Sequence, residues 1–309
     1  MPFFKASLLT LGSIAVTMLG LLFITFIIGR VMPIDPVLAI VGERASQSTY
    51  DAVYQQLGLD KPLATQWWDY MLGLLHADLG HSLYSQRSVS ELIVERLPAS
   101  IELALLSLLI AIMLALPLGL VAATQRGSFW DWLVSGFSLF GIAIPNFVFG
   151  PLLILLFSIS LGWFPVSGRE QSLSIVLPAL TLGTAMAAIL SRMLRSALLE
   201  VLGEDYIRSA RARGLSPLRV LFRHALSNAM LPLITLLGLQ LGGLLAGAVI
   251  TETVFDWPGI GRLTIEAIQR RDYPLLQGCV LFISVVYVLI NLLTDMMYRF
   301  IDPRIRVQT

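Results

Sequence analysis

Charged residues are scarce in this chain of 309 residues. Asp, Glu, Lys and Arg together make up 13% of the sequence, whereas soluble domains carry about a quarter. Hydrophobic residues make up 56%, and the mean hydropathy is +0.80. This composition excludes a soluble globular protein and predicts a chain that crosses a membrane several times.

Cysteine and histidine are also nearly absent. The single cysteine, Cys279, lies in an apolar run and cannot form a disulfide within the chain. The three histidines, His76, His81 and His224, are too scattered to give the ligand spacing of a metal site. The net charge of +1 gives no overall attraction to nucleic acid. We therefore expect neither a bound metal nor a nucleic-acid partner.

Catalytic motifs are missing from the sequence. It has no glycine-rich phosphate loop of the G-x-x-x-x-G-K-[ST] type and no metal-binding His-Glu pair. A membrane enzyme or scaffold would need a reactive cluster at one membrane face, and the sequence offers none. Carboxylates are rare in the apolar segments, where Glu102 and Asp295 lie near segment ends. Because ion-coupled carriers normally need buried carboxylates, this scarcity disfavours the main alternative, a secondary carrier or channel that is not coupled to ATP.

Six apolar segments are long enough to cross a bilayer as helices. The first is too long for the apolar region of a signal peptide and has no A-x-A-like cleavage site after it, so we expect it to be retained. The segments comprise residues 8–29, 103–123, 133–159, 174–193, 231–250 and 275–297.

The polar region 31–98 contains helix signals. Ser48 and Asp51 resemble a capping box that would open one helix. Ser88 is expected to open another short helix that ends before Pro98. The region therefore predicts a long helical loop outside the membrane.

A further helix of this loop is expected to begin at Pro62. Trp67 and Tyr70 lie on its apolar side. That side suits either the membrane surface, with the aromatic rings at headgroup level, or packing against the protein's own spans.

Lysine and arginine placement predicts the orientation. Twelve of the 21 basic residues fall on the side of the two termini, and five of the other nine lie in the long loop after the first span. Loops beyond about 60 residues count little, because they are translocated regardless of charge. Both termini are therefore expected to be cytoplasmic.

The most basic stretch, residues 200–232, lies between the fourth and fifth segments. Its pattern predicts two short helices around a sharp turn: Gly214 would end the first, Ser216 would cap the second and Pro217 would open it. Such a hairpin suits binding by a cytoplasmic partner, although it could also serve only as an orientation signal. Its arginines are Arg208, Arg211, Arg213, Arg219 and Arg223.

A few polar side chains lie within the apolar segments. They either line a solute path or hydrogen-bond neighbouring helices. These candidates are Asn146, Gln240, Asn291 and Asp295. The fifth segment also holds two pairs of glycines four residues apart, a spacing that lets helices approach closely. The pairs are Gly238 with Gly242 and Gly243 with Gly247.

The chain resembles the membrane-spanning permease subunits of bacterial ABC importers in the dipeptide/oligopeptide/nickel class. The resemblance extends over nearly the whole chain. The matching blocks include LGLDKPLATQW, ERLPASIELALLSLLIA, IPNFVFGPLLILLFS, LGWFPVSG, DYIRSARARGLSPLRVLFRHALSNAMLP and GLQLGGLLAGAVITETVFDWPGIGRL. Together with the six apolar segments, this resemblance implies an all-α membrane protein without catalytic activity of its own.

The resemblance implies that the basic hairpin is a coupling loop that docks on an ATP-hydrolysing subunit. Family members begin this loop with Glu-Ala-Ala and have a glycine four residues after the second alanine. Here Arg208, Ser209 and Ala210 occupy the first positions, and Gly214 is retained. The implied coupling residues are Ser209, Ala210, Arg211, Ala212, Arg213, Gly214, Leu215, Ser216 and Pro217.

The implied organisation has four parts: the N-terminus and first span (1–30), the outer loop (31–98), a five-helix permease core (99–299, coupling loop 200–230) and a cytoplasmic tail (300–309). The implied partners are a second permease, usually a different one, two ATPase subunits that bind ATP and Mg, an extracytoplasmic solute-binding protein, and membrane lipid. The implied location is the bacterial inner membrane. The solute stays open among dipeptides, oligopeptides, glutathione, opines and nickel chelates.

Overall fold

The computed structural model describes residue 12 and residues 15–27, 36–42, 45–56, 58–76 and 78–301. These residues form helices and connecting loops, and their β pairing is limited to one isolated bridge between His81 and Ser88. The helices are Ala15–Ile27, α2 (Pro36–Val41), α3 (Gln47–Gln56), α4 (Leu63–Leu75), α5 (Val89–Thr124), α6 (Phe129–Ala143), α7 (Asn146–Leu153), the π-helical η1 (Ile154–Ser160), α8 (Val176–Leu202), α9 (Asp205–Ala212), α10 (Pro217–Arg219), the π-helical η2 (Val220–Ala225), α11 (Leu226–Val254), α12 (Ile260–Gln269) and α13 (Tyr273–Ile301).

Within the described residues, four helical segments are long and apolar enough to cross a membrane: Val89–Thr124, Val176–Leu202, Pro217–Leu244 and Tyr273–Thr294. α6 and the α7–η1 segment pass the same test as a pair and would make a fifth. The helix Ala15–Ile27 is apolar but shorter. The ends of the predicted first span, 8–29, lie outside the described residues, as does most of the predicted tail, 300–309.

The chain divides into two compact units. The first comprises Met1–Ser100 with Pro258–Val286, and the second comprises Ile101–Trp257 with Tyr287–Thr309.

The first unit is built around a buried apolar cluster from α5, α12 and α13. At its centre α5 and α13 approach closely, because Gly278 has no side chain and Val89 packs directly over it. The cluster comprises Val89, Ile93, Ile260, Leu263, Ala267, Leu275, Leu276 and Cys279.

The apolar face of α4 packs against the helix Ala15–Ile27. The ring of Trp67 lies edge-on to Phe26, with 5.2 Å between the ring centroids, and to Phe23, at 5.7 Å. Tyr70 lies against Phe26 as well. Of the two alternatives for this face, packing against the protein's own helix therefore holds for Trp67 and Tyr70.

Two expectations about the outer loop are wrong. The helix expected to end before Pro98 instead continues to Thr124 as α5. Proline removes only one helical hydrogen bond, and the burial of Ile93 and Leu103 on either side outweighs that loss. At α3 the capping residue is Ser46, whose hydroxyl accepts a hydrogen bond of 3.2 Å from the backbone N–H of Thr49. Ser48 already lies inside the helix.

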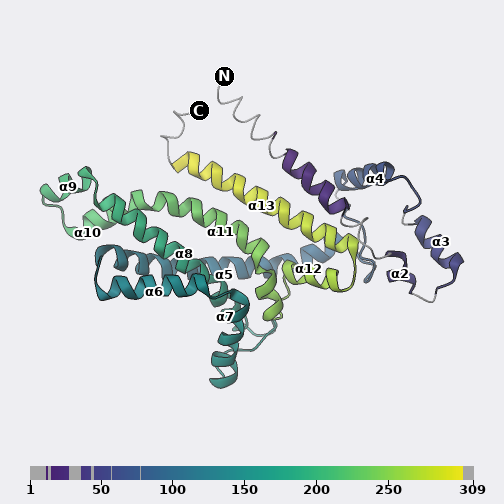
Figure 1. Cartoon of the computed structure of the whole chain (residues 1–309), viewed down its shortest axis with the longest axis horizontal. Helices are drawn as coiled ribbons and strands as arrows, with labels where there is room; N and C mark the ends of the chain where they lie inside the picture. The colour runs from purple at the N-terminus through teal and green to yellow at the C-terminus, as the bar shows by residue number, and fades with distance from the viewer. Residues whose placement is uncertain are drawn as a thin grey trace. The chain divides into compact units, whose positions relative to one another are not determined.

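The predicted third span, 133–159, is not one helix. α6 ends at Ala143, and α7 begins at Asn146 after a bend of 106° (Figure 1). Pro145 lies between them with an extended backbone and has no N–H to continue the hydrogen-bond pattern of α6. Pro145 therefore breaks the predicted span rather than only kinking it.

α8 is the centre of the second unit and is buried along much of its length. Two glycines of other helices face it and allow close approach. A Cβ atom added at Gly141 would lie 2.7 Å from the Cβ of Ala188, and one at Gly119 would lie 2.8 Å from Leu194. α8 itself contributes Gly183, which faces Ile110 of α5 in the same way. These contacts fix α5 and α6 against α8.

Candidate functional site

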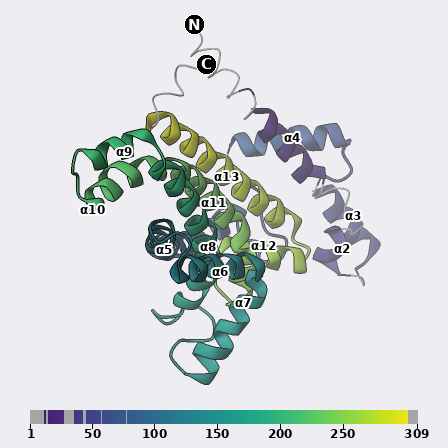
Figure 2. The same ribbon diagram turned by 60° about the vertical axis from the view of Figure 1, so that its left-hand side comes forward.

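The basic hairpin adopts the predicted turn. Gly214 has a φ of +76°, in the left-handed region that favours glycine. Ser216 occupies the position before the second helix, although its side chain makes no capping hydrogen bond, and Pro217 begins that helix. α9 and α10 lie beside each other at the ends of α8 and α11 (Figures 1 and 2).

The second arm of the hairpin does not stop as a short helix. α10 continues through η2 directly into α11. The arm is held against α8 by a buried cluster that includes Leu194, Leu198, Ile207, Val220 and Ala225. The hairpin is therefore a rigid extension of a membrane-crossing helix.

All five arginines of the hairpin are exposed. Of these five arginines, only Arg208 forms an ion pair within the described residues, with the exposed Asp205 at 3.1 Å. The leucines around the turn differ in exposure: Leu218 is 68% exposed, whereas Leu215 packs against the buried cluster. Phe222, 54% exposed, lies one turn after Leu218 and extends this apolar surface, a feature that its spacing of four residues could have predicted.

A cavity of about 760 Å³ lies beside the hairpin. Leu199 and Leu202 of α8 line it, together with two arginines, Arg126 and Arg211. The exposed surface of the hairpin and this cavity is thus apolar in places and positively charged.

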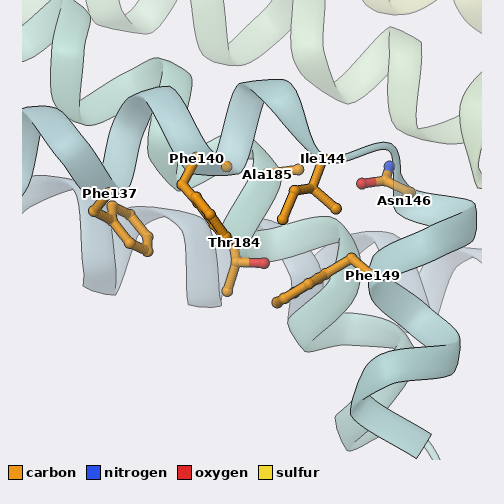
Figure 3. Close-up of a pocket in the computed structure, with 8 residues that line it drawn as sticks. Phe137, Phe140, Ile144, Asn146, Phe149, Thr184 and Ala185 are labelled. Atoms are coloured by element: carbon orange, nitrogen blue, oxygen red, sulfur yellow. The ribbon is translucent and has the colours of Figure 1, made fainter.

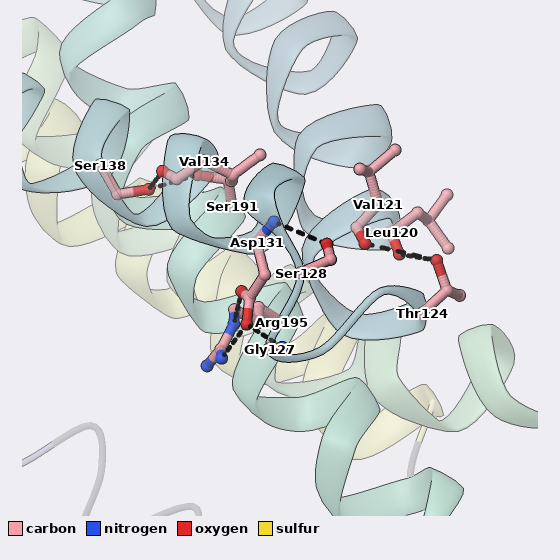
Figure 4. Close-up of polar contacts among 10 residues, drawn as sticks. All are labelled: Leu120, Val121, Thr124, Gly127, Ser128, Asp131, Val134, Ser138, Ser191 and Arg195. Atoms are coloured by element: carbon pink, nitrogen blue, oxygen red, sulfur yellow. Dashed lines mark hydrogen bonds and ion pairs between the residues drawn. The ribbon is translucent and has the colours of Figure 1, made fainter.

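Asp131 and Arg195 form a bidentate ion pair between α6 and α8 (Figure 4). Arg195 Nε lies 2.6 Å from Asp131 Oδ1, and Nη2 lies 2.9 Å from Oδ2. The backbone N–H of Gly127 also donates to Oδ2, and the hydroxyl of Ser128 accepts from the N–H of Asp131. The pair is mostly shielded from solvent, with 10% of the Asp131 side chain exposed.

Neither Asp131 nor Arg195 was among the candidate residues taken from the sequence. The signal was available: Ser128 and Asp131 have the spacing of a helix start, and carboxylates are rare in this chain. Further along the same helices, Ser138 and Ser191 share a hydrogen bond of 3.1 Å.

The helix break brings together two of the four candidate path residues. Asn146 and Gln240 line a cavity of about 240 Å³ between α7, α8 and α11. Asn291 lies elsewhere, against Gly242, and its buried side-chain oxygen has no hydrogen-bond partner among the described residues. Asp295 is part of α13, but its side chain lies outside what the structure describes.

The glycines of α11 face two different surroundings. Gly238 lies directly against Thr294 of α13, and a Cβ at Gly242 would lie 2.9 Å from the Tyr287 ring. Gly243 instead lines the cavity, with no atom within 4 Å of an added Cβ. The surroundings of Gly247 lie outside the described part of the chain.

A smaller cavity of about 100 Å³ lies beside the first, at the end of α6. The rings of Phe137, Phe140 and Phe149 line it (Figure 3), and Phe140 is itself largely exposed. Across the described residues, no three His, Cys, Asp or Glu side chains lie close enough together to hold a metal ion.

Comparisons with known proteins show the family to which the chain belongs. The family described as binding-protein-dependent transport system inner membrane component matches residues 115–307, and the N-terminal part of such membrane components matches residues 7–104. The dipeptide transport system permease protein DppB of Escherichia coli (strain K12) is 42% identical, over 96% of this chain and 97% of its own length. The di/tripeptide permease DppB of Pseudomonas aeruginosa (strain UCBPP-PA14) is 44% identical, over 96% of this chain and 97% of its own.

The glutathione transport system permease protein GsiC of Salmonella typhimurium is 41% identical over 94% of this chain and 95% of its own. Among solved structures, the inward-facing MetNI methionine ABC transporter is similar in fold, with a TM-score of 0.58 and 21% identity, and covers 69% of this chain and 97% of that chain. These comparisons confirm the resemblance found in the sequence. The chain belongs to the family of binding-protein-dependent transport system inner membrane components, the non-catalytic permease subunits of ABC importers.

Proposed function

We propose that this chain forms half of the translocation pathway of an ATP-driven importer for dipeptides, or for a related small solute such as glutathione. The support is the 41–44% identity, over nearly the full length of both chains, to permeases named for dipeptides, di/tripeptides and glutathione. ATP is bound and hydrolysed by partner ATPase subunits, and a binding protein delivers the solute outside the membrane.

The basic hairpin couples ATP hydrolysis to transport in this proposal. Its second arm is continuous with α11, so a partner that moves the turn around Gly214 also moves that helix. Leu218 and Phe222 offer exposed apolar contacts, and the free arginines can pair with acidic groups of the ATPase. Residues 209–217 are the proposed contact segment.

The solute passes along the face of the chain that carries Asn146 and Gln240, with Asn291 and Asp295 as further candidates. A cavity of about 240 Å³ in one chain does not enclose a peptide-sized route. A second permease, usually a different chain, therefore completes the pathway on this face, where Gly243 leaves the backbone of α11 uncovered.

The proposed topology has six spans, with the helix around Ala15–Ile27 as the first and both termini in the cytoplasm. This orientation rests on the positions of the lysines and arginines. The segments 31–98 and 251–274 then lie outside, where the binding protein docks, and residues 200–230 lie inside.

The test is purification of the tagged chain from its native membrane, followed by mass spectrometry and by uptake assays in proteoliposomes. We expect two ATPase subunits and a second permease to co-purify. Uptake of a labelled dipeptide should require both ATP and the binding protein. A chain that purifies alone and transports in response to an ion gradient would contradict the proposal and identify a secondary carrier.

A further inference from the structure

The cavity at the end of α6 is almost entirely apolar. Phe137, Phe140 and Phe149 supply three aromatic rings (Figure 3). The hydroxyl of Thr184 also lines it but already donates a hydrogen bond of 2.7 Å to the carbonyl of Leu180. The Thr184 oxygen can still accept a hydrogen bond, and among the side chains that line this cavity the amide of Asn146 is the one left that can donate.

Asn146 also connects this cavity to the larger one. Both it and Ala185 line the two cavities, and Gln240 adds a second amide on the far side. Among the described residues that line either cavity, none is charged. An aromatic pocket and a pair of neutral amides thus adjoin each other at the break between α6 and α7.

We propose that the two cavities form one solute-contact site, in which the aromatic cavity takes an apolar side chain of the peptide while Asn146 and Gln240 bind its backbone. This inference rests on the proposed function and adds a selectivity to it. Each amide offers both donors and an acceptor, which match the N–H and C=O of a peptide group. Aromatic rings favour the binding of apolar side chains of the solute, because this contact removes apolar surface of both from water.

The lack of charged side chains in the site fits the moderate binding that transport needs. A transported solute must be bound well enough to enter and weakly enough to leave. A guanidinium or carboxylate in a shielded site would hold the charged ends of a peptide much more strongly. Neutral amides with an apolar pocket instead give moderate binding that depends on the side chain.

The test compares two peptides in proteoliposomes that contain the whole complex, its binding protein and ATP. Labelled Leu-Leu and Gly-Gly differ in the apolar side chains. We expect Phe140→Ala and Phe149→Ala to lower the ratio of Leu-Leu to Gly-Gly initial uptake by about 10-fold, the effect of losing apolar contacts in a pocket. Because the binding protein is the same throughout, a change in the ratio reports on the permease.

Phe147→Ala is the matched control. Phe147 belongs to α7, as Phe149 does, and is 56% exposed, but it does not line either cavity. Its ratio should stay at the wild-type value. Ala185→Met provides a second variant, which fills the space between the cavities without removing an aromatic ring and should also slow Leu-Leu more than Gly-Gly.

Three outcomes would overturn the inference. An unchanged ratio in all variants would show that the aromatic cavity does not contact the solute, while the proposed function would stand. Equal loss of both uptakes together with loss of the second permease would show that these rings hold that subunit rather than the solute. A wild-type complex that imports neither of these peptides nor glutathione would overturn the proposed function as well.

Discussion

Ser82 donates a hydrogen bond of 2.5 Å to the carboxylate of Asp272, a residue 190 positions later in the chain. The backbone N–H of Leu83 donates to the same carboxylate at 3.1 Å. Asp272 is 1% exposed, and Arg270 stacks over the ring of Tyr84 nearby, 4.3 Å from its centroid. In the first unit, this contact fastens the loop before α5 to the start of α13.

Replacing Asp272 by Ala should destabilise this contact, because the Ser82 hydroxyl and the Leu83 N–H would lose their acceptor. We expect a cost of about 1–3 kcal/mol, measured as a lower melting temperature of the purified complex. Asp69→Ala is the control, because its ion pair with Lys61 is half exposed and should be worth less than about 1 kcal/mol. Equal effects of the two substitutions would contradict this role of Asp272.

Breaking the ion pair between α6 and α8 should be costly. Arg195→Leu leaves the carboxylate of Asp131 without its main partner in a shielded position, with an expected loss of roughly 3 kcal/mol. Arg192→Leu removes an exposed arginine from the same helix and should change stability little. Thermal unfolding of the two variants measures the difference, and recovery in Asp131→Asn with Arg195→Leu would show that the unpaired charge is the cause.

Gly214→Trp should prevent binding of the ATPase subunits without preventing membrane insertion. A side chain at φ +76° strains the turn, yet no atom lies within 4 Å of an added Cβ, so the hairpin can still pack. Gly162→Trp is the control, because Gly162 has a φ of +65° and equally open surroundings outside the hairpin. Co-purification of the ATPase with the Gly214 variant at the wild-type level would contradict this prediction.

Two glycines of α11, Gly238 and Gly243, should respond differently to replacement by alanine. Gly238→Ala places a methyl group against Thr294 and should cost about 1–3 kcal/mol through overpacking. Gly243→Ala meets no atom within 4 Å in this chain and should leave the stability of the isolated chain unchanged or slightly higher. Thermal unfolding before and after addition of the second permease would also show whether position 243 is covered by that partner.

Added salt should release the ATPase subunits from the complex. The hairpin arginines are exposed, and their attraction to acidic groups is screened as the Debye length falls from about 10 Å at 0.1 M salt to about 3 Å at 1 M. The ATPase retained on immobilised complex at each salt concentration measures this effect. Sucrose at matched osmolality is the control, and retention that is independent of salt would indicate a mainly apolar contact through Leu218 and Phe222.

Local chemistry in the sequence predicted several features of the hairpin. The turn at Gly214 and the helix start at Pro217 depend on backbone preferences of single residues, which act within a few positions. The continuation of that helix into α11 was missed, because an apolar span and a basic arm look like separate segments when only composition changes between them.

Features that depend on distant residues could not be predicted in the same way. Pro98 signalled a helix end, and only the burial of the residues around it keeps α5 intact. The four polar candidates looked equivalent in the sequence, but Asn146 and Gln240 line one cavity beside the break at Pro145. Asn291 of α13 instead lies against Gly242 of α11. Such pairings depend on how helices pack, which spacing along one segment does not determine.

The break between α6 and α7 also bears on how the cell assembles this protein. Each helix end leaves backbone N–H and C=O groups without helical partners, and hydrocarbon offers them none. In the proposed complex the second permease would cover the unpaired groups at this break, so a newly inserted chain without that partner should expose them to lipid. Orphan copies should be short-lived and removed by membrane proteases, so that the abundance of this chain follows that of its partner.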